Sequence, residues 1–144
     1  MSFGWRLVQS LFILSMGNDM KADWNKYPNF KKAEFDCKAT GENNMQHEFM
    51  EKLQAIRTEY GKGITVTSGF RSVKHPVEAK KTHSHGEHTQ GFCADISCTS
   101  GSERFRLVNL ALKHGITRIG IAKTFLHLGI GGVNLPNNVI WEYQ

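Results

Sequence analysis

The chain has 144 residues, of which 40% are hydrophobic and 22% are charged. This length and balance predict one domain with a hydrophobic core, and they exclude a disordered, collagen-like or low-complexity chain. The 18 basic and 13 acidic residues leave a formal net charge of +5, which by itself selects no class of partner. Three cysteines are too few, and odd in number, for a fold built on disulfides.

The first segment of the chain differs from the rest. Arg6 is followed by an apolar stretch over residues 7–14, which has the outline of a weak signal peptide. Gln9 and Ser10 interrupt that stretch, and no small-residue cleavage site follows it. We therefore expect an N-terminal extension at residues 1–20, with Met20 as an alternative start, and a single domain at residues 21–144. No apolar run reaches the roughly 18 to 20 residues of a membrane-spanning helix.

The next elements in chain order are a helix and a strand. Apolar residues three or four positions apart place one hydrophobic face on a helix that Gly61 and Gly63 end; they are Met45, Phe49, Leu53, Ile56 and Tyr60. Residues 64–67 read Ile-Thr-Val-Thr, a strand pattern that ends at Ser68-Gly69. Residues 72–91 have no periodicity and predict a long loop.

The second half predicts one more helix and several short strands. Ser102 is suited to cap a helix whose apolar positions are Phe105, Val108 and Leu112. The predicted strands lie at 94–97, 116–122, 125–130 and 139–143. Helices that do not alternate regularly with strands favour an α+β class, with a small antiparallel sheet flanked by helices.

Three residues suit a metal site. His88 ends the polar loop, and Asp95 follows seven residues later on a predicted strand. Zinc accepts imidazole nitrogen and carboxylate oxygen as ligands, and His127, within an apolar strand, is the best third candidate. Taken alone, His127 reads as a histidine packed in the core, and the other two residues change that interpretation.

Other metal patterns are weaker. His47-Glu48 has Glu51 at the position where a zinc-peptidase helix needs a second histidine, and the cysteines form no CxxC pair. Cys93 reads as a small apolar residue packed beside the site. His83 and His85 are alternative ligands, but a histidine-rich loop is more often simply solvated.

Five motifs occur in an order typical of one family. They are Glu34-Phe35-x-Cys37, Thr67-Ser68-Gly69-Phe70-Arg71-Ser72, His75-Pro76, His88-x-x-Gly91-x-x-Ala94-Asp95-Ile96 and Phe125-Leu126-His127. This order resembles the D-alanyl-D-alanine carboxypeptidase-like zinc peptidases of peptidase family M15, above all the small single-domain members of phages and bacteria. The resemblance extends over residues 24–143.

The resemblance implies the zinc-binding fold shared with hedgehog signalling domains, with His88, Asp95 and His127 as ligands of Zn²⁺. It implies that Arg71 binds the substrate or stabilises the oxyanion, and Ser68 is a further candidate contact. A structural salt bridge for Arg71 and a turn role for Ser68 remain the alternatives. The implied reaction is hydrolysis of D-amino-acid amide bonds in the peptidoglycan stem peptide, of D,D-carboxypeptidase or endopeptidase type. We expect a monomer that acts at the bacterial cell wall.

The expected general base is missing from its usual places. Family members carry an acidic residue three positions before the last zinc histidine, or read His-x-Asp, whereas this chain has Thr124 and Gly129 there. Glu87 and Glu142 are possible substitutes that spacing alone does not place. A zinc-binding module of the same fold with impaired catalysis, serving in wall binding or structure, is therefore the alternative. A nucleic-acid binder is disfavoured because the basic residues are scattered.

Overall fold

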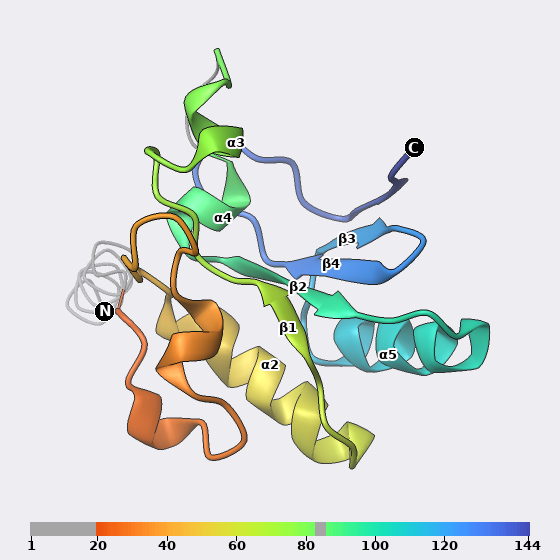
Figure 1. Cartoon of the computed structure of the whole chain (residues 1–144). Coiled ribbons are helices and arrows are strands. Elements are labelled where there is room, and N and C mark those ends of the chain that lie inside the picture. Colours follow the sequence, from red (N-terminus) through yellow and green to blue (C-terminus); the bar gives the residue numbers. More distant parts are fainter. Residues whose placement is uncertain (1–19, 83–85) are drawn as a thin grey trace, which may run out of the picture.

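The computed structural model describes residues 20–82 and 86–144. The predicted extension, apart from Met20, and the candidate ligands His83 and His85 therefore lie outside the described residues. Figure 1 shows a sheet with the two longest helices on one of its faces. The elements are η1 (Trp24–Lys26), η2 (Lys32–Phe35), α2 (His47–Tyr60), β1 (Val66–Ser68), α3 (Pro76–Ala79), α4 (Glu87–Gln90), β2 (Cys93–Ser97), α5 (Gly101–Lys113), β3 (Arg118–Ile121), β4 (Phe125–Gly129) and β5 (Val139–Glu142).

The sheet has five strands in the order β1-β2-β4-β3-β5. The α+β class is confirmed, but the expectation of an antiparallel sheet holds for only three of the four strand pairs. β5 runs parallel to β3, with Gly120 opposite Trp141. Because β2 and β3 occupy both edges of β4, β5 pairs with the outer edge of β3 and not with β4. The chain reverses between β4 and β5, so β5 runs antiparallel to β4 and parallel to β3.

The predicted first helix is confirmed as α2. Its buried residues are spaced three or four apart and include Phe49, Leu53 and Ile56, so one face packs into the core. The helix ends at Gly61, whose φ of 74° is the left-handed conformation that suits a glycine cap. On the sheet, the side chains that meet this helical layer alternate with those of the other face; they are Ala94, Ile96, Leu126 and Leu128.

Helix α5 buries only part of the predicted face. Val108 is partly buried and packs against the core, but Phe105 is 74% exposed and Leu112 is 54% exposed, while Leu107 and Ala111 lie in the core. The two stripes lie on different sides of the same helix, and the path from β2 into β3 decides which one meets the core. The N-cap is Ser100, whose Oγ accepts from the backbone N of Glu103, and not the predicted Ser102.

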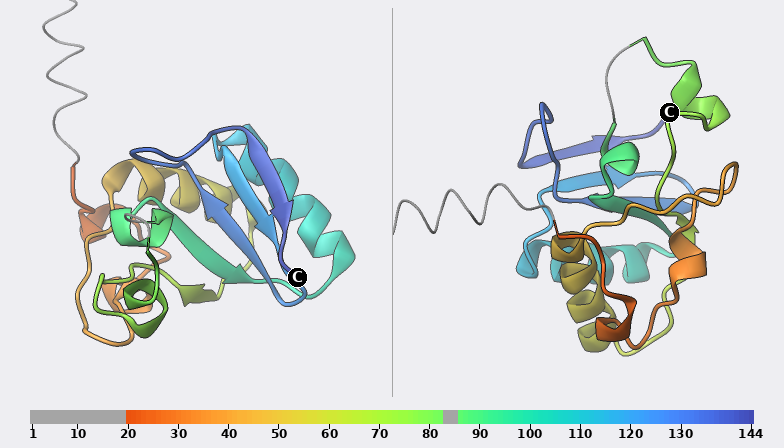
Figure 2. Two further views of the ribbon diagram at one scale, coloured as in Figure 1. Left: turned by 90° about the horizontal axis from the view of Figure 1, so that it is seen from above. Right: turned by 90° about the vertical axis from the view of Figure 1, so that its left-hand side faces the viewer.

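The described residues between β1 and β2 contain helical turns that the predicted loop lacked. It contains the one-turn helices α3 and α4, and His75 caps α3 by accepting from the backbone N of Val77. Figure 2 shows both short helices on the side of the sheet opposite α2 and α5. The fold therefore leaves one sheet face for α3, α4 and the residues they carry.

Within the described residues no helix has the length and apolar character needed to cross a bilayer.

Candidate metal centre

One row of residues crosses the whole sheet on the face away from α2. The register pairs Ser68 with Asp95, Asp95 with His127, His127 with Gly120, and Gly120 with Trp141. Register partners in neighbouring strands point to the same face, so these side chains stand side by side. Gly120 leaves room for the last of them, because a Cβ there would lie 2.7 Å from the Trp141 ring. The row places polar side chains next to the ring of Trp141.

The three predicted ligands meet beside this row, to which two of them belong. Asp95 comes from β2, His127 from β4 and His88 from α4, and all three are buried. Asp95 Oδ1 lies 3.0 Å from His127 Nδ1, and Asp95 Oδ2 lies 3.4 Å from His88 Nε2. The carboxylate of Asp95 is thus placed between one nitrogen of each imidazole ring.

The other nitrogen of each ring makes a hydrogen bond that fixes its orientation. His88 Nδ1 donates to the carbonyl oxygen of Gly69 over 2.7 Å, so Nε2 is the nitrogen that faces Asp95. His127 Nε2 donates to Glu87 Oε1 over 2.6 Å, which leaves Nδ1 facing Asp95. Histidines that bind metals in proteins typically donate their second ring nitrogen to a carbonyl or carboxylate in this way.

These distances fit a small tetrahedral metal ion. Ligand atoms about 2.0 to 2.1 Å from a tetrahedral zinc ion lie roughly 3.3 Å from one another. The separations of 3.0 and 3.4 Å between Asp95 oxygens and the two ring nitrogens are close to that value. Two imidazoles and one carboxylate also leave one coordination position open, which is the arrangement of catalytic rather than structural zinc sites.

Cys93 is a fourth residue of this cluster. Ligand atoms of His88, Cys93 and His127 all lie within 4.8 Å of one another among the described residues. The predicted role as an apolar neighbour is therefore incomplete, since Cys93 shares the sheet face of Asp95. Burial, together with the charges of Glu87 and Asp95, raises the pKa of the Cys93 thiol well above its usual value. A metal ion would displace the thiol proton on binding, so Cys93 and Asp95 are both candidates for the third ligand of this cluster.

The charges of the cluster depend on one another. Burial alone raises the pKa of Asp95, but hydrogen bonds from His127 and His88 outweigh burial and lower it. Burial alone lowers the pKa of His127, but Asp95 and Glu87 outweigh burial and raise it. The carboxylates of Asp95 and Glu87 therefore favour the doubly protonated imidazolium form of His127. A cation that binds at Nδ1 must displace the proton on that nitrogen.

Both substitutes for the missing carboxylate can now be placed. Glu87 is buried at 6% exposure and contacts His127, while Gly131 N donates to its Oε2 over 2.7 Å. Glu142 is exposed and neighbours Trp141 on β5, so it points to the opposite face of that strand. The ring of Trp141 lies 5.2 Å from that of His127, a contact that no sequence pattern predicted.

Arg71 lies at the edge of the cluster. Its Nη2 is 3.4 Å from Asp95 Oδ2, its Nη1 is 3.7 Å from Glu78 Oε1, and its Nε donates to Ser68 Oγ over 3.1 Å. The salt bridges that the sequence left as an alternative are thus present. The side chain of Arg71 keeps 22% of its surface exposed, so part of the guanidinium faces solvent beside Asp95. Ser68, the last residue of β1, holds that guanidinium in place.

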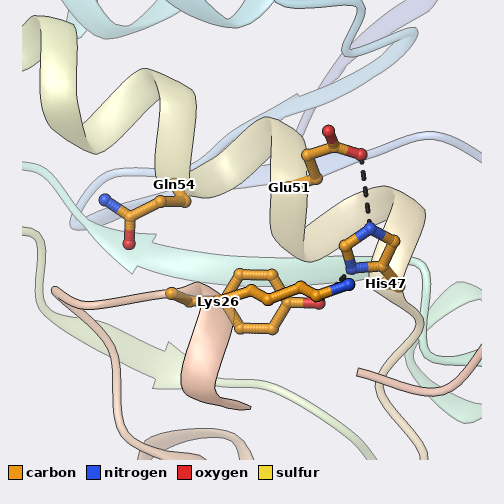
Figure 3. Close-up of a pocket in the computed structure, with 5 residues that line it drawn as sticks. Lys26, His47, Glu51 and Gln54 are labelled. Carbon is orange, nitrogen blue, oxygen red and sulfur yellow. Dashed lines mark hydrogen bonds and ion pairs between the residues drawn. The ribbon is translucent and has the colours of Figure 1, made fainter. Parts of the chain in front are cut away.

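A separate cavity of about 240 Å³ lies beside α2, and no group of three metal-ligating side chains lines it among the residues that the structure describes. Figure 3 shows His47 and Glu51 on one side of it, joined by an ion pair of 3.5 Å. Tyr27 Oη lies 2.5 Å from His47 Nδ1, so both ring nitrogens have partners. We interpret this group as support for the packing of η1 on α2.

Comparison with known families agrees with this site. The family model for Peptidase M15 matches residues 28–129, which is more than two thirds of the chain. The chain therefore belongs to the Peptidase M15 family, and the match includes His88, Asp95 and His127. No match to a curated protein was found. The family assignment supports a peptidase, and the predicted family is confirmed.

Proposed function

We propose that the protein is a zinc-dependent metallopeptidase that hydrolyses D-amino-acid amide bonds in the stem peptide of peptidoglycan. One observation carries the proposal. The carboxylate of Asp95 lies between His88 Nε2 and His127 Nδ1, and each ring is oriented by a hydrogen bond from its other nitrogen. His88, Asp95 and His127 would hold the ion, as the family resemblance implies.

Zn²⁺ bound there would supply a Lewis acid that polarises a carbonyl group and a water molecule. The chain's own residues have separate tasks. Arg71 presents a partly exposed guanidinium beside Asp95, where it can donate to a peptide carboxylate or to a developing oxyanion. Ser68 holds Nε of Arg71, and Trp141 covers the side of the His127 ring. These contacts define where the carbonyl group of a substrate would lie.

The substrate class and the cellular setting belong to the proposal as well. A net charge of +5 suits an anionic cell wall, and we propose that the protein acts there as a monomer, either exported or delivered by a phage. D,D-carboxypeptidase and endopeptidase activity both fit the same residues.

The test is incubation of the zinc-loaded protein with muropeptides, followed by mass spectrometry of the products. We expect release of D-alanine or cleavage of a cross-link, and loss of both with a chelator. His88→Ala should abolish zinc binding and cleavage, whereas His114→Ala, which removes a histidine paired with Glu59 outside the site, should leave both unchanged. Cleavage that persists after complete removal of zinc would contradict the proposal.

A second candidate is a zinc-binding module without turnover that binds the cell wall. The favouring observation is that each of the buried carboxylates of the described residues already has partners: Asp95 binds both histidines, Glu78 binds Lys81, and Glu87 binds His127. A general base would have to come from elsewhere. Stoichiometric zinc and binding to isolated cell walls without any cleaved product would favour this module.

A further inference from the structure

Glu87 and Gly129 fit each other in space although they are 42 positions apart in sequence. Glu87 is the first residue of α4, and Gly129 is the last residue of β4. A Cβ on Gly129 would overlap Oε2 of Glu87 and would lie 2.7 Å from its Oε1. The glycine therefore leaves the space that the Glu87 carboxylate fills. A carboxylate reaches this position from α4, whereas the sequence resemblance implies one attached to β4.

Both oxygens of Glu87 accept hydrogen bonds. Oε2 accepts from the backbone N of Gly131 over 2.7 Å. Oε1 accepts from Arg118 Nε over 3.0 Å and from His127 Nε2 over 2.6 Å. Arg118 is itself held in place, because its guanidinium lies 5.3 Å from the centre of the Trp141 ring and donates to Pro136 O. Gly131 and Arg118 thus hold the carboxylate in place in addition to its bond with the histidine.

We propose that Glu87 is the positioning residue of His127, holding Nε2–H so that Nδ1 faces Asp95. The inference rests on the proposed metal site. His127 stands on a strand, and its ring can turn about the Cβ–Cγ bond to present either nitrogen to Asp95. The bond to Glu87 selects one of these two orientations. Partners that hold a metal-binding histidine in this way are worth about 10- to 100-fold in metal affinity.

The first variant is Glu87→Gln, which keeps the size of the side chain. A glutamine has one accepting oxygen and one donating nitrogen, whereas Glu87 accepts at both positions. Either orientation of the amide sets donor against donor, at His127 and Arg118 or at Gly131. We expect zinc affinity, measured by competition with a chromophoric chelator, to fall about 10-fold or more. Glu78→Gln is the matched control, because Glu78 is also buried but its ion pairs are with Lys81 and Arg71 and not with His127.

A second readout separates positioning from general stability. Long-range ¹H–¹⁵N spectra identify which ring nitrogen of His127 carries a proton, with and without zinc. In the wild type we expect a hydrogen-bonded Nε2–H in both states and zinc at Nδ1. In Glu87→Gln the Nε2–H signal should lose its hydrogen-bonded shift, while Glu78→Gln should keep it. Because the zinc-free spectrum reports the bond to Glu87 directly, this test remains informative even if the wild type binds no zinc, which would contradict only the metal site.

A third pair of variants moves the carboxylate from α4 to β4. Gly129→Asp alone should destabilise the fold, since its side chain would collide with Glu87. Combined with Glu87→Ala, which clears the space, Gly129→Asp should recover at least about 10-fold of the zinc affinity that Glu87→Ala loses. The proposal is overturned if Glu87→Gln binds zinc as tightly as Glu78→Gln, or if zinc-bound His127 is coordinated through Nε2.

Discussion

Asp95 and His127 are register partners on β2 and β4, and their Oδ1 and Nδ1 atoms lie 3.0 Å apart. The two strands form the β2–β4 pair of the sheet, and the residues that alternate with them, Ala94 and Leu128, are fully buried against the helices. A shift of register by one residue would exchange the two faces and bury the polar pair in the core. The sheet therefore positions two residues of the candidate site, and the third, His88, is positioned by α4.

The assignment of Asp95 rather than Cys93 as third ligand predicts opposite results for two substitutions. Asp95→Asn should reduce zinc affinity by more than the roughly 100-fold typical of an outer partner, since it removes a charged ligand. Cys93→Ala should keep one zinc ion per chain, measured by elemental analysis.

Cobalt substitution provides an independent check on Cys93. The Co²⁺-loaded wild type should lack the intense near-ultraviolet band of a thiolate ligand. A strong band in the wild type that disappears in Cys93→Ala would show that the thiol is a ligand and would overturn the assignment.

Arg71→Lys should lower kcat/KM by about 100-fold while the zinc content is retained, provided that the proposed peptidase activity is present. A lysine keeps the charge beside Asp95 but loses the planar fork that also binds Ser68 and Glu78. Steady-state kinetics on a stem-peptide substrate measure the effect. Arg57→Lys, at the end of α2, is the control, and equal kcat/KM values for the two variants would exclude a substrate role for Arg71.

Gly91→Ala should destabilise the protein by at least about 2 kcal/mol. Gly91 ends α4 with a φ of 80°, and a Cβ there would overlap the backbone O of Asn44 and lie 2.9 Å from its carbonyl carbon. Urea denaturation measures the change. Gly63→Ala, which meets nothing within 4 Å, should stay within about 0.5 kcal/mol of the wild type. Similar losses for both variants would contradict this account of the HxxG glycine.

Tyr60 should make the fold sensitive to alkaline pH. Burial and the hydrogen bond to Glu103 raise the pKa of Tyr60 to about 12. Between the usual tyrosine pKa near 10 and this value, the unfolded chain releases the proton and the folded chain keeps it. The folded state then binds more protons, so its free energy of unfolding falls as pH rises.

We therefore expect the wild type to be more stable than Tyr60→Phe at pH 7 by about 1 kcal/mol. This difference should shrink between pH 10 and pH 12, as measured by urea denaturation at each pH. Tyr143→Phe is the comparison variant. Burial also raises the pKa of Tyr143, but its hydroxyl does not bond Glu103, so the corresponding change with pH should be weaker. A constant difference across this range would contradict the raised pKa of Tyr60.

Local elements could be predicted wherever the spacing of apolar residues allowed only one buried face. The spacing from Phe49 to Tyr60 left one apolar face, and α2 buries it. Two apolar stripes were available on α5, and of the predicted one Phe105 and Leu112 face solvent while Val108 packs against the core. The parallel pairing of β3 with β5 was also missed, because the partner of β5 depends on the order of the strands in the sheet and not on the strand's own residues.

The sequence by itself determined the α+β class, the family and the residue types of the candidate site, because motif spacing and strand alternation are properties of neighbouring residues. Only the tertiary structure decided that Glu87 reaches the space above Gly129, that Trp141 packs on His127, and that Cys93 stands beside the two histidines. These contacts join α4, β2, β4 and β5, which are distant along the chain. Strand register and the close approach of backbones bring them together, and spacing along the sequence encodes neither.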